Sequence, residues 1–179
     1  MKLMIASDIH GSAYYCNLML KILEAENPDK LLLLGDLLYH GPRNDLPREY
    51  LPKKVIEMLN SISSKILAVR GNCEAEVDQM VLNFPVLADY AMVFANSKTF
   101  FATHGHVYNE NNLPSIGQGD ILLNGHTHIP KFIKHENYTF INPGSVSIPK
   151  EDSPHSIVIY ENGNFKWIDI EKLSEFIPE

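Results

Sequence analysis

Seven side chains that favour metal ions lie along this chain in five short groups. Each group directly follows a run of apolar residues, and nearly every group includes a glycine. The seven residues are Asp8, His10, Asp36, Asn72, His104, His126 and His128. In an open α/β sheet, ligands bind beyond the carboxyl ends of the strands, and neighbouring strands lie only about 4.8 Å apart. Five strand ends can therefore bring these side chains to one rim.

The mixture of donor atoms indicates which metals would bind. Imidazole nitrogens, carboxylates and one amide oxygen suit borderline divalent ions, with Mn²⁺ expected and Fe²⁺, Zn²⁺ or Ni²⁺ as alternatives. Seven ligands are too many for one tetrahedral zinc, but they match two ions that share a bridging carboxylate. Taken singly, each residue could instead be an exposed loop residue or a hydrogen-bonded core group. The repeated placement of a ligand after a strand favours two metal ions.

The glycines beside the proposed ligands have two interpretations. They let the chain turn sharply off a strand and approach an ion or phosphate closely, or they are ordinary turn residues. The residues concerned are Gly11, Gly35, Gly71, Gly105 and Gly125.

The elements that must position these groups can be predicted from apolar patterns. Strands are expected over residues 3–6, 31–34, 66–69, 100–102 and 121–123. Ser12 can cap a helix that ends at Asn27-Pro28, and Pro52 can begin a second helix. Because these helices alternate with the strands of the first half of the chain, the pattern predicts a parallel βαβ sheet.

The second half of the chain predicts hairpins instead. Pairs of apolar segments flank Asn96-Ser97, Asn137 and Asn162-Gly163, which are turn-forming residues. We therefore expect one domain over residues 1–179 with an α/β fold: a four-layer sandwich of two packed mixed β-sheets flanked by helices.

Five blocks of this sequence resemble the signature of calcineurin-like metallophosphoesterases: Asp-x-His, Gly-Asp, Gly-Asn, His-Gly-His and Gly-His-x-His. Residues 7–11, 40–44, 69–74, 76–80 and 142–149 further resemble YfcE-type bacterial phosphodiesterases, which implies a homo-oligomer. The resemblance also implies two ions bridged by Asp36. One would be held by Asp8, His10, Asp36 and His128, and the other by Asp36, Asn72, His104 and His126.

Cys73 departs from the wider superfamily, in which most members carry a histidine that stabilises or protonates the leaving alkoxide. A thiol with an ordinary pKa of about 8.5 is a weak donor near neutral pH. The expected catalytic residues are Asn72, Cys73 and, as an alternative proton donor, His106. Cys73 could equally be a buried, inert residue.

Arg43 is the expected substrate-binding residue, because a guanidinium can hold a phosphate through two hydrogen bonds. It lies in the loop from Gly41 to Pro52, which we expect at the edge of the site. A solvated loop arginine is the alternative. Glu74 is expected to hydrogen-bond a metal-binding side chain.

Composition narrows the class of partner. The net charge is −7, and no basic cluster follows an expected strand or helix, so extended nucleic acid is not expected to bind. Two cysteines are too few for a disulfide framework. The chain has neither a signal peptide at its start nor a stretch of about 20 apolar residues, so we expect a cytoplasmic protein with no membrane partner.

We predict a metal-dependent phosphoric diester hydrolase, in which metal-bound hydroxide attacks the phosphorus of a small phosphodiester. A phosphomonoesterase with the same site is one alternative, although a protein phosphatase would need longer surface loops. The other alternative is a non-catalytic scaffold of the same fold, like the retromer subunit. Such a scaffold would be expected to lack ligands, whereas all seven are present here.

Overall fold

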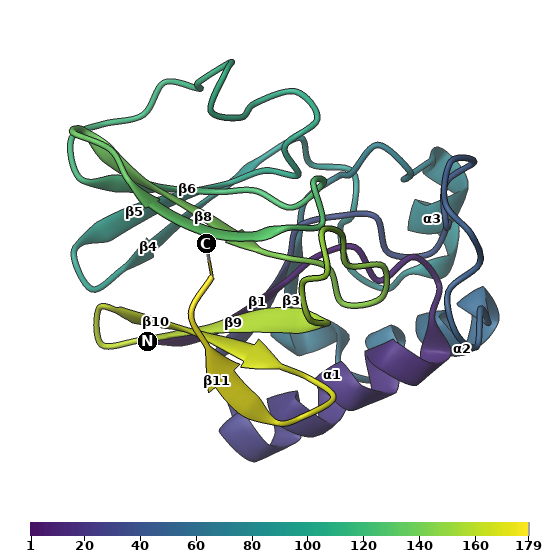
Figure 1. Cartoon of the computed structure of the whole chain (residues 1–179). Helices are drawn as coiled ribbons and strands as arrows, with labels where there is room; N and C mark the ends of the chain where they lie inside the picture. Colours follow the sequence, from purple (N-terminus) through teal and green to yellow (C-terminus); the bar gives the residue numbers. More distant parts are fainter. Residues whose placement is uncertain (179) are drawn as a thin grey trace.

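The computed structural model describes residues 1–178 and contains two β-sheets packed face to face (Figure 1). The first sheet has the order β11-β10-β9-β1-β2-β3, and the second has the order β4-β5-β6-β8-β7. The strands of the first sheet are β1 (Lys2–Ala6), β2 (Lys30–Leu33), β3 (Ile66–Ala68), β9 (Ser156–Glu161), β10 (Asn164–Asp169) and β11 (Ser174–Phe176). Those of the second are β4 (Ala91–Ala95), β5 (Lys98–Ala102), β6 (Asp120–Leu123), β7 (Pro130–Lys134) and β8 (Tyr138–Pro143).

Each sheet contains a parallel core to which antiparallel hairpins are added. β1, β2 and β3 run parallel, as do β5, β6 and β8, while the other pairings are antiparallel. The three predicted hairpins are β4–β5, β7–β8 and β9–β10. Asn96 and Ser97, like Asn162 and Gly163, have positive φ, as a two-residue turn between antiparallel strands requires.

The helices are α1 (Ala13–Glu26), α2 (Pro52–Ser61) and the short α3 (Glu76–Val81), with a 3₁₀ turn at Ser63–Lys65. α1 begins where predicted, because the Ser12 hydroxyl accepts a hydrogen bond from the Tyr15 amide at 3.3 Å. It ends at Asn27, whose left-handed backbone closes the last turn. Pro52 is the first residue of α2, where its missing N–H has no consequence. No helix within residues 1–178 has the length and apolar run needed to cross a membrane.

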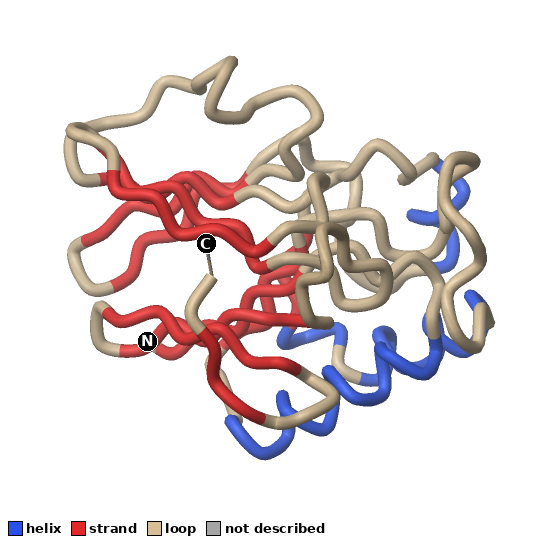
Figure 2. The backbone as a smooth tube through the Cα atoms, viewed as in Figure 1, coloured by secondary structure: helices blue, strands red, loops and turns tan. Residues whose placement is uncertain are grey.

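Alternation along the strands divides the core between the two faces of the first sheet. Leu3 and Ile5 point into the space between the sheets, where they meet residues such as Phe100 and Ile141 of the second sheet. Met4 and Ala6 point the other way, against α1 and α2. Figure 2 shows these helices on the outer face of the first sheet.

The outer face of the second sheet is covered by a loop. Phe101, Leu122 and Phe140 form a small cluster there, against which Tyr108 and Ile116 of the loop over residues 103–119 pack. This segment contains several glycine and asparagine residues and Pro114, so it favours turns over a helix. The predicted α/β sandwich of two mixed sheets is confirmed, and within residues 1–178 its outermost layer on this side is this loop.

The inner core should be the most sensitive part of the fold. Leu32 is 1% exposed between the sheets, whereas its partner on the neighbouring strand, Leu67, is 37% exposed at the sheet edge. We expect Leu32→Ala to lower the free energy of unfolding by about 2–5 kcal/mol through the cavity it leaves, and Leu67→Ala by less than about 1 kcal/mol. Urea denaturation of both variants measures this difference, and equal losses would contradict the packing described here.

Candidate metal centre

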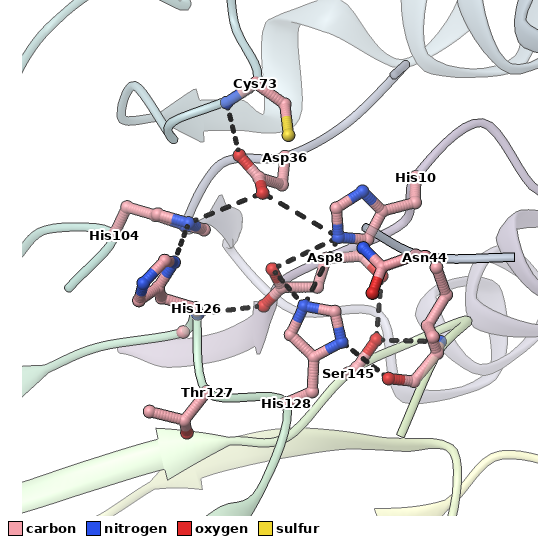
Figure 3. Close-up of polar contacts among 12 residues, drawn as sticks. Asp8, His10, Asp36, Asn44, Cys73, His104, His126, Thr127, His128 and Ser145 are labelled. Atoms are coloured by element: carbon pink, nitrogen blue, oxygen red, sulfur yellow. Dashed lines mark hydrogen bonds and ion pairs between the residues drawn. The ribbon is translucent and has the colours of Figure 1, made fainter. Parts of the chain in front are cut away.

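All seven proposed ligands lie together beyond the carboxyl ends of the parallel strands. Asp8 and His10 follow β1, Asp36 follows β2, and Asn72 follows β3, while the histidines come from the loops after β5 and β6. Figure 3 shows the labelled carboxylates and imidazoles pointing toward one another. The predicted convergence of distant segments on one rim is therefore what the structure contains.

One group of donors surrounds Asp8. Its Oδ1 lies 3.2 Å from His128 Nε2 and 3.6 Å from His10 Nε2. The two imidazole nitrogens lie 3.3 Å from each other. These three residues offer one ligand atom each within a space that suits a single ion.

A second group surrounds His104. Its Nε2 lies 3.0 Å from Asn72 Oδ1 and 3.2 Å from His126 Nδ1. Asp36 lies between the two groups, because its Oδ2 is 3.5 Å from His104 Nε2 and 3.7 Å from His10 Nε2. This is the position that a carboxylate shared by two ions would need.

Hydrogen bonds outside the site orient three of the rings. His10 Nδ1 donates a hydrogen bond to the Tyr39 carbonyl at 2.7 Å, and His104 Nδ1 donates to the Leu34 carbonyl at 2.7 Å. His128 Nδ1 donates to the Ile148 carbonyl at 2.5 Å. The neutral form of each ring then carries a lone pair on Nε2, which faces the centre of the site. The backbone thus prepares these rings to act as ligands.

The donor set suits cations because nitrogen and oxygen lone pairs face the centre of the site. Asp8 Oδ1 is buried and has no hydrogen-bond partner within residues 1–178, although two imidazole nitrogens face it. A buried carboxylate oxygen without a partner is costly. A divalent cation among these atoms would satisfy the oxygen and the ring lone pairs together.

Electrostatics within the group agree with this arrangement. Burial alone would raise the pKa of Asp8, but His10 and His128 hold that pKa well below its ordinary value, so the carboxylate stays ionised. Burial opposes protonation of His10, yet Asp8 beside it raises the pKa of His10. Protons and metal ions therefore compete for this ring.

The backbone at the site adopts an uncommon conformation. Five of the seven proposed ligands have φ between 47° and 65°, namely Asp8, His10, Asp36, His126 and His128. Such left-handed residues cost about 1–3 kcal/mol each and persist only where the surroundings hold them. Hydrogen bonds between the loops supply that support, including His10 N to Asp36 O at 2.9 Å and Gly125 N to His104 O at 2.8 Å.

Two glycines are required by close approach. A Cβ at Gly71 would overlap Asp36 Oδ1, and a Cβ at Gly125 would overlap the Ser7 hydroxyl and lie 2.8 Å from Asp8 Oδ2. Any side chain at these positions would displace a carboxylate of the site. At these two positions the structure therefore favours close approach over ordinary turn formation.

Glu74 supports the site through the backbone. Its carboxylate accepts hydrogen bonds from the amides of Asp36, Leu37 and Gly71, at 2.9, 2.7 and 2.5 Å. The expected bond to a metal-binding side chain is thus replaced by bonds that fix the turn carrying Asp36. Glu74 ties the loops after β2 and β3 to each other.

The two residues proposed to donate protons occupy different surroundings. The Cys73 amide donates to Asp36 Oδ1 at 2.9 Å, and burial together with the Asp36 charge raises the pKa of its thiol. His106 is exposed, with its ring 5.4 Å from that of His104, and burial on one side together with His104 lowers its pKa. Without metal ions, both groups are therefore neutral near pH 7.

Arg43 lies beside the site. It lines a pocket of about 290 Å³ together with His10, Asp36, Cys73 and His128. Lys150 and Asn44 line the same pocket, and Lys150 Nζ donates to Asn44 Oδ1 at 3.3 Å. Lys150 was not among the residues expected at the site, although it directly follows the stretch of residues 142–149 that resembles the family.

Three further polar residues, all within the family-like stretch of residues 142–149, support the ligands. The hydroxyls of Ser145 and Ser147 donate to the Asp8 carbonyl at 2.9 and 3.1 Å. The Asn142 amide donates to the Gly125 carbonyl at 2.8 Å and to Thr127 Oγ1 at 3.1 Å. The stretch around residues 142–147 therefore fixes the backbone of two ligand loops.

Known proteins share this sequence and architecture. Residues 1–164 match the calcineurin-like phosphoesterase superfamily domain. Phosphodiesterase YfcE of Escherichia coli strain K12 is 47% identical over 162 residues, which cover 90% of this chain and 88% of that protein. Phosphodiesterase MJ0936 of Methanocaldococcus jannaschii is 24% identical over 151 residues, covering 80% of this chain and 83% of that protein.

Solved structures extend the comparison. YfcE, a phosphoesterase from E. coli, matches with a TM-score of 0.96 at 44% identity, covering 99% of this chain and 97% of that one. Vps29 from Entamoeba histolytica in complex with Zn²⁺ matches with a TM-score of 0.63 at 18% identity, covering 98% and 96%, which shows the fold alone. The resemblance inferred from the sequence is confirmed, and this chain belongs to the calcineurin-like phosphoesterase superfamily.

Proposed function

We propose that this protein is a phosphodiesterase that depends on two divalent metal ions, with Mn²⁺ as the expected metal. Asp8, His10, Asp36 and His128 would hold one ion, and Asp36, Asn72, His104 and His126 the other. The observation that carries the proposal is the set of inward-facing nitrogens around two carboxylates, one of which has a buried oxygen with no hydrogen-bond partner among residues 1–178. Asp36 lies between the two groups of donors.

Support for a diester substrate comes from relatives and from the pocket. YfcE and MJ0936 are both named phosphodiesterases. The pocket beside the ligands, at about 290 Å³, is of a size for a small ester and not for an extended chain. Arg43 and Lys150 line it and supply positive charge for a phosphate group.

The side chains have separate tasks in hydrolysis. When bound, the two cations supply Lewis acidity, which lowers the pKa of water and offsets charge on the phosphate oxygens. Arg43 and Lys150 orient the phosphate at the open side of the pocket. The Cys73 thiol, held neutral by burial and by Asp36, can donate only a weak hydrogen bond to a leaving oxygen.

The first prediction concerns the metals. Protein stripped of metal by a chelator should be inactive and should regain diesterase activity with Mn²⁺, and less well with Mg²⁺, which prefers oxygen ligands. Elemental analysis of the active protein should give about two ions per chain if both donor groups are filled. Full activity in protein shown to be metal-free would contradict the proposal.

The second prediction concerns the bridging carboxylate. Asp36→Asn removes a charge shared by both ions and should lower kcat/KM at least about a hundredfold. Even the loss of a group that only orients a metal ligand lowers metal affinity or activity about 10- to 100-fold. Arg43→Ala removes a contact to the phosphate and should lower kcat/KM about tenfold. Activity and metal content are measured on both variants. If Asp36→Asn binds two ions and turns over normally, the ligand assignment is wrong.

The third prediction separates a diesterase from a phosphomonoesterase. With a weak donor at Cys73, the rate for aryl diesters should rise steeply as the leaving phenol becomes more acidic. Cys73→His introduces a group with an ordinary pKa of about 6.5, so this dependence should flatten, and alkyl esters and phosphomonoesters should gain most. Leaving-group slopes are compared for the two proteins at saturating Mn²⁺. Identical slopes would leave Cys73 as a packing residue.

A further inference from the structure

A second cavity lies between the two sheets at the end of the sandwich opposite the metal centre. It has a volume of about 530 Å³, larger than the pocket beside the proposed ligands. Its rim includes Lys98 at the start of β5, Lys134 at the end of β7 and Gly163 in the β9–β10 turn. These segments lie together at the end of the sandwich away from the ligand loops (Figure 1). We call this space the far cavity.

Several aromatic side chains line the far cavity. Tyr160, Phe165 and Trp167 line it from the first sheet, and Phe132 lines it from the second. The Phe132 and Trp167 rings meet edge to face with centroids 5.8 Å apart, and Tyr160 and Phe165 lie 4.8 Å apart. Ligand sites of about 300–1,000 Å³ typically have such apolar walls with a few polar groups among them.

Tyr160 supplies a polar group that the protein leaves unsatisfied. Its side chain is 1% exposed, and its hydroxyl has no hydrogen-bond partner within residues 1–178. Trp167, in contrast, donates its Nε1–H to the Asn142 carbonyl at 2.9 Å. A buried hydroxyl without a partner is costly, and because this one is shielded from solvent, a neighbouring ring must move aside for a polar atom of a ligand to relieve that cost.

Charge around the rim is positive although the whole chain is acidic. Lys98, Lys134 and Lys166 line the far cavity, and Glu175 is its one acidic residue within residues 1–178. Glu175 pairs with Lys166 at 3.0 Å. The other two ammonium groups have no carboxylate partner in that part of the chain, in a protein whose net charge is −7. This local surplus favours an anion.

We propose that the far cavity binds a small aromatic anion, independently of the substrate of the metal centre. Its ring packs among Phe132, Phe165 and Trp167, and a polar atom pairs with the Tyr160 hydroxyl. Its acidic group lies at the rim, within reach of Lys98 and Lys134. The aromatic walls select for a planar ring, and the lysines select for negative charge.

A matched pair of fluorescent probes tests the proposal. 1-Anilinonaphthalene-8-sulfonate is an aromatic anion, and N-phenyl-1-naphthylamine is the same molecule without the sulfonate. Trp167 is the sole tryptophan of the chain, so energy transfer from it reports binding near the far cavity. We expect the sulfonate probe to bind at one site per chain and the neutral probe to bind at least about tenfold more weakly, as loss of a charge-assisted contact implies.

Four variants locate the bound probe. Tyr160→Phe and Lys134→Gln should each raise the Kd of the sulfonate probe about threefold or more. Tyr138→Phe and Lys131→Gln are their controls and should leave the Kd unchanged, because Tyr138 packs on the outer face of the second sheet and Lys131 alternates with Lys134 along β7. Thermal unfolding checks that each variant is folded.

Two results would overturn the proposal. One is equal affinity for the two probes, which would mean that the cavity does not select an anion. The other is an equal Kd in Tyr160→Phe and Tyr138→Phe, which would place the probe elsewhere. Displacement of the probe by 1-naphthalenesulfonate and 1-naphthoate, but not by uncharged 1-naphthalenemethanol, would support the proposal. The proposed diesterase activity does not enter any of these measurements.

Discussion

Nitrogen and oxygen lone pairs that face one another without protons between them are the constraint on which the rest of this structure depends. Three imidazoles donate their only neutral-state N–H outward to carbonyls, so their other nitrogens converge on Asp8 and Asp36. Such an arrangement is unfavourable unless cations occupy it, because lone pairs held close together in a buried site repel one another. Cations at these positions would turn that repulsion into a source of stability for the folded chain.

Hydrogen bonds from residues that follow strands of both sheets hold the metal-binding side chains in place. Glu74 fixes the turn that carries Asp36, and Ser145 and Ser147 hold the carbonyl of Asp8. The Asn142 side-chain amide donates to the Gly125 carbonyl in the loop after β6. The Asn142 carbonyl accepts a hydrogen bond from the Trp167 indole N–H of the other sheet. The left-handed residues are therefore held by hydrogen bonds between neighbouring ligand loops and by further polar contacts, some of which cross between the sheets.

Features set by residues close together in the sequence could be predicted, whereas features set by contacts between distant segments could not. The strand ends, the Ser12 cap and the Pro52 start are local signals, and the structure contains all of them. The convergence of seven residues followed from the rule that parallel strands end on one rim. Lys150 and Tyr160 could not be assigned in this way, because their surroundings come from segments distant in sequence, such as Asn44 beside Lys150 and Phe100 beside Tyr160. The loop over residues 103–119 has turn-forming composition, but its role as a layer depends on the apolar face it covers.

The two ends of the sandwich differ for a reason that follows from strand direction. The parallel strands begin at the far cavity and end at the proposed ligands, so loops leaving the carboxyl ends carry the polar chemistry. At the opposite end the strands are joined by tight hairpins such as Asn162-Gly163, which are too short to cover the space between the sheets. Phe132 and Phe165 there stay partly uncovered and lysines lie around them, which is why an acidic protein has a positively charged, aromatic cavity at this end. A cluster of buried carboxylates and a cluster of lysines thus occupy opposite ends of one core, each where the connections leave room for it.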